Sequence, residues 1–240
     1  MKVIVSFLLV FISSFVCAQD PDHNIWSELL NKNVTENGIV NYKGLRADSN
    51  QLNLYLNILE ENPPQKTWSN EAIMAYWINA YNAYTVKLVI THYPLKSIKD
   101  IAGKIPFVNT SWDIKFIKIG GETLDLNNIE HGKLRKNFDD PRIHMALVCA
   151  SKSCPILMNK AFTADQLDSQ LDNQSRKFLE DPFRNKIKSN SASVSKIFNW
   201  YGGDFKKSGG VRAFINKYSE VKIHEKAKIN YLDYDWGLNE

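Results

Sequence analysis

The feature that most constrains the fold is a long apolar segment in the first half of the chain, residues 70–92. Ser69 precedes it as an N-cap candidate, Pro94 follows it, and the intervening EAIMAYWINAYNAYTVKLVI is apolar on nearly all sides. A helix without a broad polar face is covered by other elements over most of its surface. We therefore expect residues 70–92 to form the central helix of the core.

Shorter elements are expected on both sides of this helix. Helices are expected at residues 24–34, from Asp48 to the Pro63-Pro64 pair, at 128–138 with Asn127 or Asn128 as cap, after a capping box at 163–166, and at 211–218. Strands are expected at residues 38–42, at 113–119 and 122–126 joined as a hairpin by Gly120-Gly121, and at 143–149, 186–188, 194–200 and 229–234. Helices kept apart from mostly antiparallel strands are typical of the α+β class, and we expect a single domain of that class with a long buried central helix.

Residues 1–18 have the layout of a cleavable secretory signal. One positive residue is followed by the almost wholly apolar residues 3–16, and small Ala18 precedes a polar stretch. The apolar run is shorter than the ~20 residues of a membrane-spanning helix, and no later segment is apolar enough, so we expect no membrane span. We expect an exported protein, periplasmic or secreted, in which an N-terminal helical segment, residues 19–67, packs on a domain formed by residues 68–240.

The chain has three cysteines, and cleavage after Ala18 would discard the first of them, Cys17. The residues just before Cys17 lack the leucine and small residues that a lipoprotein signal places there. The mature chain then retains Cys149 and Cys154, both within residues 142–155 (RIHMALVCASKSCP). Export would expose these two thiols to an oxidising compartment.

Charge and motifs argue against several classes of function. The formal net charge is +4 at pH 7, and the basic residues are scattered without interleaved aromatic residues, which argues against nucleic acid as a partner. The chain has no P-loop, GxGxxG, HExxH or GxSxG motif, which argues against a nucleotide enzyme, a zincin and an α/β-hydrolase. No cofactor is indicated, and the expected partner is an unidentified small-molecule, peptide or envelope substrate.

Residues 142–155 are the strongest candidate for a functional site. Pro155 suits the first position of a helix, which would place Cys154 at or beside an N-cap. There the helix dipole favours the thiolate, which is the reactive form of cysteine. His144 on the preceding strand is the candidate base, and Glu130 is the candidate carboxylate that orients it.

Alternatives remain open for these residues. His131 is a second candidate base, and because adjacent helix residues point about 100° apart, only one of Glu130 and His131 can face a given site. Cys149 and Cys154 form a disulfide or redox pair if the loop turns back on itself, or they pack as two small apolar side chains. A zinc site built from the histidines and cysteines lacks a metal-binding spacing.

Other groups near this segment are candidates for supporting roles. Asp140 is an alternative carboxylate for orienting the base, and Arg142 begins the candidate segment. Backbone N–H groups of residues 153–156 are candidates for an oxyanion site. The aromatic cluster at residues 200–205 is expected to pack at a turn, and no feature of the sequence singles out a role for Asp204 within it.

Asn79 and Asn82 lie three residues apart on one face of the apolar helix. Buried amides need partners, because leaving one unpaired costs ~1–3 kcal/mol. The two side chains either bond a neighbouring loop and stabilise the fold, or line the cleft and steady the cysteine loop or a substrate amide.

Five segments together carry a resemblance to a known family. They are AYWINAYNAYTV at residues 75–86, IEHGKLR at 129–135, RIHMALVCASKSCP at 142–155, WYGGDF at 200–205 and YDWGLN at 234–239. In this order they resemble the domain-of-unknown-function family 547, which has no assigned activity, over residue 68 to the C-terminus. The resemblance implies a common α+β domain and directs attention to Asn79, Glu130, His131, His144 and Cys154.

The Cys/His/Glu set is similar to those of papain-like or transglutaminase-like thiol enzymes. In those enzymes the cysteine opens a helix early in the domain, whereas the early helix here carries Asn79. Three functions are expected. The first is a thiol-dependent hydrolase or acyl transferase acting on an amide or ester, with Cys154 as nucleophile. The second is a noncatalytic envelope binding module, and the third is a dithiol redox role for Cys149 and Cys154.

Overall fold

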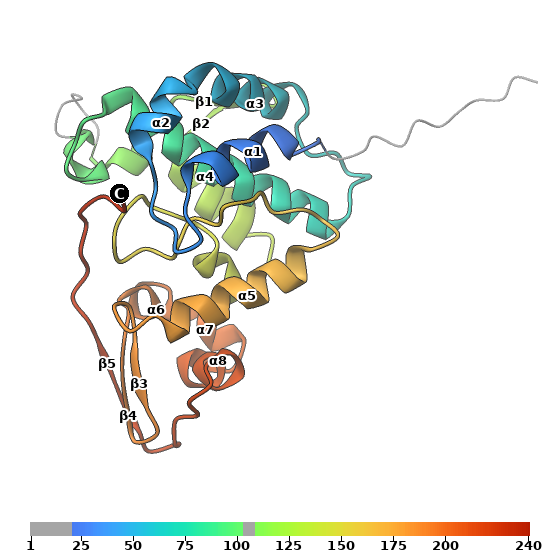
Figure 1. Ribbon diagram of the computed structural model, residues 1–240. Coiled ribbons are helices and arrows are strands. Elements are labelled where there is room, and N and C mark those ends of the chain that lie inside the picture. The colour runs from blue at the N-terminus through green and yellow to red at the C-terminus, as the bar shows by residue number, and fades with distance from the viewer. Residues whose placement is uncertain (1–20, 103–108) are drawn as a thin grey trace, which may run out of the picture.

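The structure, a computed structural model, describes residues 21–102 and 109–240, so the predicted secretory signal at residues 1–18 lies outside the described part (Figure 1). The α-helices are α1 (Asn24–Asn33), α2 (Tyr42–Ala47), α3 (Ser49–Glu61), α4 (Asn70–His92), α5 (Leu167–Glu180), α6 (Ile197–Trp200), α7 (Gly202–Lys207) and α8 (Gly210–Tyr218). The 3₁₀-helices are η1 (Ile98–Asp100), η3 (Ser111–Asp113) and η5 (Pro141–Met145), and η4 (Asn128–Arg135) is a π-helix. The strands are β1 (Ile117–Ile119), β2 (Glu122–Leu124), β3 (Lys186–Lys188), β4 (Ser191–Val194) and β5 (Lys228–Tyr231).

Helix α4 occupies the centre of the larger core, as the sequence predicts (Figure 1). Ser69 caps it by accepting a hydrogen bond from the backbone N–H of Ala72 at 3.1 Å. Buried side chains occur on opposite sides of the helix, for example Tyr76 and Ile78, and α2, α3, η4 and α5 pack against it. Within the part of the chain that the structure describes, no helix is long and apolar enough to cross a membrane.

The N-terminal helices follow the sequence expectation except at the predicted strand 38–42. That segment makes one isolated bridge, between Val34 and Val40, and then enters α2. The helix begins there because the Asn41 side chain accepts a hydrogen bond from the backbone N–H of Gly44 at 2.9 Å. Asp48 precedes α3 as predicted but makes no cap, because its carboxylate binds Lys32 and Asn33 instead.

The strands form two small sheets, and the fold is mixed α+β with about half of the described residues helical. The predicted hairpin is confirmed: β1 and β2 pair antiparallel around Gly120 and Gly121, whose φ values of +60° and +79° suit glycine in a two-residue turn. In the second sheet β3 pairs antiparallel with β4, and β4 pairs parallel with β5. The single, mostly antiparallel sheet expected from the sequence is therefore divided in two and contains one parallel pair.

The predicted buried strand at residues 143–149 is wrong. The Asp140 side chain accepts from the backbone N–H of Arg142, and Pro141 follows Asp140, so the chain starts the 3₁₀-helix η5 there instead. The apolar residues are buried as expected, but no strand pairs with them. The amide of Asn82 takes that place, because it donates to the Ala146 carbonyl at 2.9 Å and accepts from the Val148 N–H at 2.9 Å.

The C-terminal part forms a second core, in which phenylalanines of α5, α6, α7 and α8 pack together against the β3–β4–β5 sheet. Strands at residues 186–188 and near 229–234 are found, whereas most of the predicted strand 194–200 is the turn and helix α6. The Ser195 side chain accepts from the N–H of Ile197 and so favours a turn after β4. Helix α5 begins after the predicted capping box at residues 163–166 and has no side-chain cap.

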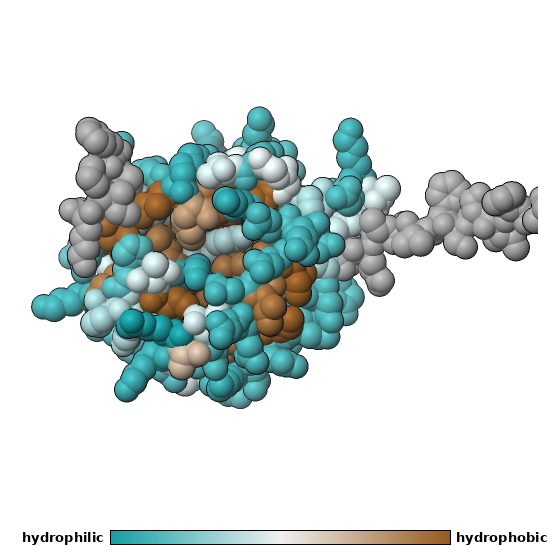
Figure 2. Space-filling model, turned by 90° about the horizontal axis from the view of Figure 1, so that it is seen from above, coloured by the Kyte–Doolittle hydropathy of each residue, from teal (hydrophilic) through white to brown (hydrophobic). Residues whose placement is uncertain are grey.

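Helix α5 lies between the two cores and contributes side chains to both (Figure 1). The face of the molecule around α1, α2 and α3 is mostly hydrophilic, with apolar patches between the polar side chains (Figure 2). The cysteine segment lies elsewhere, where residues from α4, η4, α6 and the C-terminal residues 234–239 converge.

Candidate functional site

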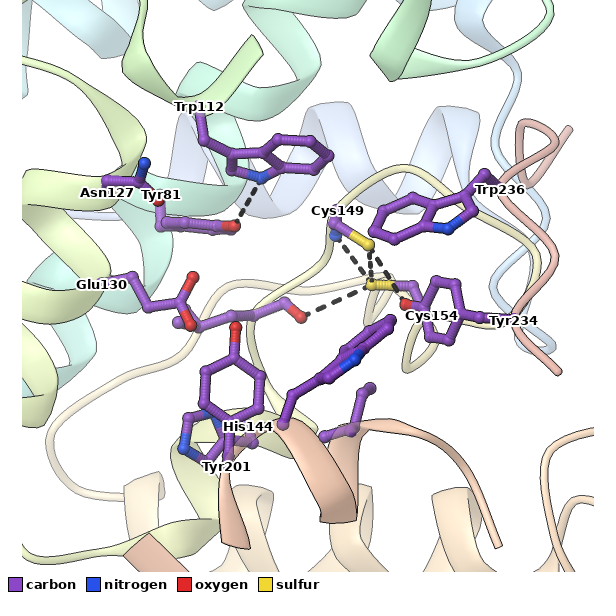
Figure 3. Close-up of a pocket in the computed structure, with 13 residues that line it drawn as sticks. Tyr81, Trp112, Asn127, Glu130, His144, Cys149, Cys154, Tyr201, Tyr234 and Trp236 are labelled. Atoms are coloured by element: carbon purple, nitrogen blue, oxygen red, sulfur yellow. Dashed lines mark hydrogen bonds between the residues drawn. The ribbon is translucent and has the colours of Figure 1, made fainter. Parts of the chain in front are cut away.

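A pocket of about 170 Å³ contains both cysteines that the sequence singles out. Its walls are mainly aromatic, and the six rings are those of Tyr81, Trp112, Trp200, Tyr201, Tyr234 and Trp236. Glu130 faces the pocket from η4, on the opposite side from the two sulfur atoms (Figure 3). The pocket thus combines a carboxylate, two thiols and an aromatic lining.

The cysteine loop, residues 149–154, is held by the C-terminal residues 234–239. Lys152 N–H donates to the Gly237 carbonyl at 2.8 Å, and Ser153 N–H donates to the Asp235 carbonyl at 3.2 Å. The Ser153 hydroxyl accepts in turn from the Asp235 N–H at 2.9 Å. These bonds occupy the backbone of the loop and fix the direction in which its side chains point.

The loop begins with a strained residue. Ala150 has φ +58°, a left-handed conformation that costs a residue with a Cβ atom about 1–2 kcal/mol. The turn at Ala150 lets the chain fold back, so that the Sγ atoms of Cys149 and Cys154 lie 2.8 Å apart with both thiols free. The backbone N–H of Cys149 also donates to the Cys154 sulfur at 2.8 Å. The loop therefore turns back on itself, which is the condition that we stated for pairing of Cys149 with Cys154.

The two thiols differ in exposure and in pKa. Burial raises the pKa of Cys149, but hydrogen bonds to its sulfur from Cys154, Ser151 and Tyr234 outweigh burial and lower the pKa below its ordinary value. Cys154 is 2% exposed, and burial, together with its hydrogen bond to Cys149 and the charge there, raises its pKa well above the ordinary value. Cys149 is only partly buried. The more exposed and more acidic thiol is therefore Cys149, whereas the sequence favours Cys154.

Cys154 does not lie at a helix N-terminus, and this expectation from the sequence is wrong. No helix begins at Pro155, because Cys154 N–H already donates to the Ser151 carbonyl at 3.1 Å within the loop. Ser153 N–H is bonded to Asp235, and Pro155 has no N–H to offer. Of the predicted oxyanion group, residues 153–156, the first three therefore offer no free N–H, and no helix dipole acts on the Cys154 sulfur.

His144 lines the pocket but is engaged with other groups. Its Nε2 lies 2.8 Å from Asp204 Oδ2, and its ring stacks on Tyr201 with ring centroids 3.8 Å apart. Burial lowers the pKa of His144 and exceeds the opposing effects of Asp204 and Glu130, so the ring is neutral at pH 7. Since a carboxylate can only accept, Nε2 carries the proton. No hydrogen bond joins His144 to either sulfur among the described residues.

Asp204, to which the sequence assigns no role, forms the polar anchor behind the pocket wall. Its Oδ2 accepts from Arg135 Nε at 2.6 Å as well as from His144. The Arg135 guanidinium lies 4.9 Å from the centroid of the Tyr201 ring. Burial opposes ionisation of Asp204, but the hydrogen bonds from Arg135 and His144 outweigh it and lower the pKa of the carboxyl. The WYGGDF segment was the sequence signal for this residue.

Glu130 lies near Tyr201 (Figure 3) and makes no hydrogen bond to His144 among the described residues. Burial, together with the Glu130 charge, raises the pKa of Tyr201 above its ordinary value. Helix η4, which carries Glu130, is capped by the Asp125 carboxylate at the N–H of Asn128, at 2.6 Å, and not by the predicted Asn127 or Asn128 side chains. Glu130 therefore supplies the negative charge of the pocket.

His131 lies outside the pocket. Its Nδ1 is 2.8 Å from Arg135 Nη1 on the exposed side of η4, while the adjacent Glu130 is buried and faces inward. Glu130 and His131 point in different directions because adjacent residues of a helix are rotated about 100° from each other. Of the four predicted catalytic residues, the structure brings Cys154, His144 and Glu130 to one pocket and places His131 elsewhere.

The predicted supporting residues Asn79, Asn82 and Arg142 bond other segments of the chain and hold them in place. Asn82 holds the backbone that leads into Cys149, as described above, and Asn79 bonds both the N–H and the carbonyl of Phe162 at 2.9 and 2.7 Å. Arg142 points away from the pocket. Its guanidinium contacts carboxylates on two segments, and these are Asp140, Asp168 and Asp172. Arg142 thereby ties η5 to α5, and the predicted alternative orienting residue, Asp140, is occupied in this contact.

Removing the Tyr234 hydroxyl is expected to move the reactivity of Cys149 to higher pH. The hydroxyl lies 3.3 Å from the Cys149 sulfur and lowers the pKa of that thiol. Since only the thiolate is alkylated, the rate with iodoacetamide rises as pH passes the pKa. In Tyr234→Phe the midpoint of that rise should lie at higher pH than in the wild type. Tyr231→Phe, on exposed β5, is the matched control and should not move it; an unchanged midpoint in Tyr234→Phe would show that the hydroxyl has no role.

Among the described residues no group of three His, Cys, Asp or Glu side chains is arranged to hold a metal ion.

Comparison with known proteins gives one match. Residues 65–179 match the model of a family described as "Protein of unknown function, DUF547", and this part of the chain is a DUF547 domain. No curated protein and no solved structure matches the chain. The matched residues include α4, Glu130, His144 and both cysteines, whereas Asp204, Tyr234 and Trp236 lie outside them.

Proposed function

We propose that the DUF547 domain of this chain carries a dithiol–disulfide site, in which Cys149 attacks a substrate sulfur and Cys154 resolves the product. One observation carries the proposal: the two sulfur atoms lie 2.8 Å apart, and they differ in character. Both cysteines line the pocket, but Cys149 is partly exposed and has a lowered pKa, while Cys154 is buried and has a raised pKa. A reactive thiolate next to a buried resolving thiol is the arrangement that thiol–disulfide exchange requires.

The exchange proceeds in two balanced steps. The Cys149 thiolate attacks a substrate disulfide, so that a mixed disulfide forms on Cys149 and one substrate thiolate leaves. The Cys154 thiol then gives its proton to that thiolate, and its sulfur attacks the Cys149 sulfur. The Cys149–Cys154 bond forms, and the second substrate thiolate leaves. Two electrons pass from the protein to the substrate, and the reverse sequence oxidises a substrate dithiol.

The thiol-dependent hydrolase or acyl transferase remains the second candidate, and papain-like or transglutaminase-like enzymes are its analogy. It needs a base in contact with the nucleophile and donors for an oxyanion. His144 donates to Asp204 instead, and the N–H groups of Ser153 and Cys154 are already bonded to the carbonyls of Asp235 and Ser151. The dithiol proposal needs neither a base nor an oxyanion site, so we prefer it. A binding module without chemistry would not require Cys149 to face the pocket as an acidified thiol.

We also propose that the protein is exported by means of residues 1–18 and works in the periplasm or outside the cell. Disulfides form and persist in those compartments, so both redox states of the site would be accessible there. The substrate would be a thiol or disulfide on a small molecule, a peptide or an envelope protein.

A redox titration tests the proposal. Protein with Cys17→Ser, so that only Cys149 and Cys154 react, is equilibrated in glutathione buffers of graded ratio, quenched in acid and analysed by intact mass. We expect one reversible transition in which the protein loses two hydrogen atoms, with bridged Cys149 and Cys154 identified by peptide mapping. Failure to form the bridge at any ratio, or a bridge that mild reductant cannot open, would contradict the proposal.

A further inference from the structure

Glu130 is a buried carboxylate that forms no ion pair in the described part of the protein. It is 5% exposed, lines the pocket and points into it (Figure 3). No lysine, arginine or histidine forms an ion pair with it in residues 21–102 or 109–240. The neutral Tyr201 hydroxyl lies near it, and the Glu130 charge helps to raise the pKa of that hydroxyl. A buried charge without an opposite charge is costly, so this carboxylate favours a positively charged occupant of the pocket.

The basic residues nearest to Glu130 in sequence are engaged elsewhere. On η4, Lys133 pairs with Glu122 at 3.0 Å, and Arg135 pairs with Asp204 at 2.6 Å. Neither Lys133 nor Arg135 lines the pocket, although the Arg135 charge interacts with Glu130 at longer range. The pocket also contains Cys149, whose lowered pKa adds a second negative charge when the thiol ionises. The polar groups at the two ends of the pocket are therefore both anionic or able to become so.

The walls between these ends suit an organic cation. Cations bind the faces of aromatic rings, tryptophan best of all, within about 6 Å of the ring centroid. The Trp236 ring already makes a cation–π contact within the protein, because Lys99 Nζ lies 4.9 Å from its centroid. Trp112 donates its N–H to the Tyr81 hydroxyl at 3.2 Å, so it offers a ligand its ring rather than a donor. Trp200, 47% exposed and packed against Trp236, places a further ring at the pocket.

Two of the hydrogen-bond donors in the pocket wall, of the kind that an anionic or sugar ligand would need, are already engaged. The side-chain amide of Asn127 donates to Asp113 at 2.7 Å, and the Trp112 N–H is bonded to Tyr81. We propose that this pocket binds an organic cation, a substituted ammonium group held between the tryptophan rings and the Glu130 carboxylate. Resting on the proposed dithiol function, the inference further assigns the substrates to thiols or disulfides that carry an ammonium group near the sulfur.

The test uses ligands without sulfur, so that binding is separated from thiol chemistry. Choline and its neutral isostere 3,3-dimethylbutan-1-ol are titrated against the reduced full chain, with tryptophan fluorescence and calorimetry as readouts. We expect saturable binding of choline at least about tenfold tighter than binding of the isostere, because only the cation gains from the rings and the carboxylate. Equal binding of the two ligands, or no choline binding at millimolar concentration, would overturn the inference.

Variants assign the effect to residues. Glu130→Gln is expected to weaken choline binding about tenfold or more and to leave the isostere unchanged. Glu122→Gln, on exposed β2, is the matched control and should retain wild-type binding. Trp200→Leu changes a ring that is 47% exposed, so the fold should persist while choline affinity falls severalfold. Wild-type choline affinity in both Glu130→Gln and Trp200→Leu would sink the inference.

The two proposals fail independently. Choline binding without a reversible bridge in the glutathione titration would leave the cation pocket standing and remove the redox function. A reversible bridge without choline binding would support the redox function and remove the cation pocket.

Discussion

Cys149→Ser is expected to slow the reaction of the reduced protein with a small neutral disulfide, bis(2-hydroxyethyl) disulfide, by about two orders of magnitude or more. The remaining thiol, Cys154, is 2% exposed and has a raised pKa, so it is seldom a thiolate and seldom within reach of the substrate. The rate is measured by acid quenching and intact mass in the Cys17→Ser background.

Cys154→Ser is expected to give the complementary result. Cys149 still attacks, but nothing resolves the mixed disulfide, which should accumulate to one adduct per chain. This pair of variants assigns attack and resolution to separate residues. If Cys149→Ser kept a wild-type rate and Cys154→Ser lost it, the roles would be reversed, and Cys154 would be the nucleophile that the sequence favours.

Asn82→Ala is expected to lower the free energy of unfolding by roughly 2–6 kcal/mol, since it leaves two buried backbone groups unpaired at about 1–3 kcal/mol each. Those groups are the Ala146 carbonyl and the Val148 N–H, directly before Cys149. For a chain of this size each 1 kcal/mol lowers the melting temperature by about 2–4 °C, so the loss should be plain in a thermal melt. The freed loop should also lose the close approach of the two sulfurs and react more slowly.

Asn79→Ala is the matched control for the effect on chemistry. Its side chain bonds the N–H and carbonyl of one buried residue, Phe162, so a comparable loss of stability is expected. Phe162 lies outside the cysteine loop, and at a temperature where both variants are folded Asn79→Ala should keep its thiol reactivity. Equal reactivity of the two variants would show that Asn82 stabilises the fold without positioning the site.

Elements with local signals were predictable. Helix α4 follows from its apolar sequence and the Ser69 cap, and the β1–β2 hairpin follows from adjacent glycines between two strand-like runs. The strand predicted at residues 143–149 was wrong because a short apolar run indicates burial but does not identify which groups hydrogen-bond its backbone N–H and C=O groups. Here the answer is Asn82, 66 residues before Val148 in the chain, and not a neighbouring strand.

The candidate site was also predictable only in part. The sequence drew attention to Glu130, His144 and the two cysteines, because acid, imidazole and thiol groups within a short segment are chemically conspicuous. It assigned the wrong local geometry to Cys154, since Pro155 permits a helix to begin without requiring one. It also gave no reason to join His144 with Asp204, 60 residues apart, or to bring Trp112 and Trp236 into contact.

By itself, the sequence determined that a buried helix organises an α+β fold and that two thiols lie five positions apart within residues 142–155. Only the tertiary structure decided which thiol is the more exposed in the pocket, which carboxylate remains without an ion pair and which base is hydrogen-bonded to another partner. The reason is physical. Helix caps, turns and apolar patterns act over a few residues, whereas burial and the partner of a charged group depend on which distant segments the core brings together.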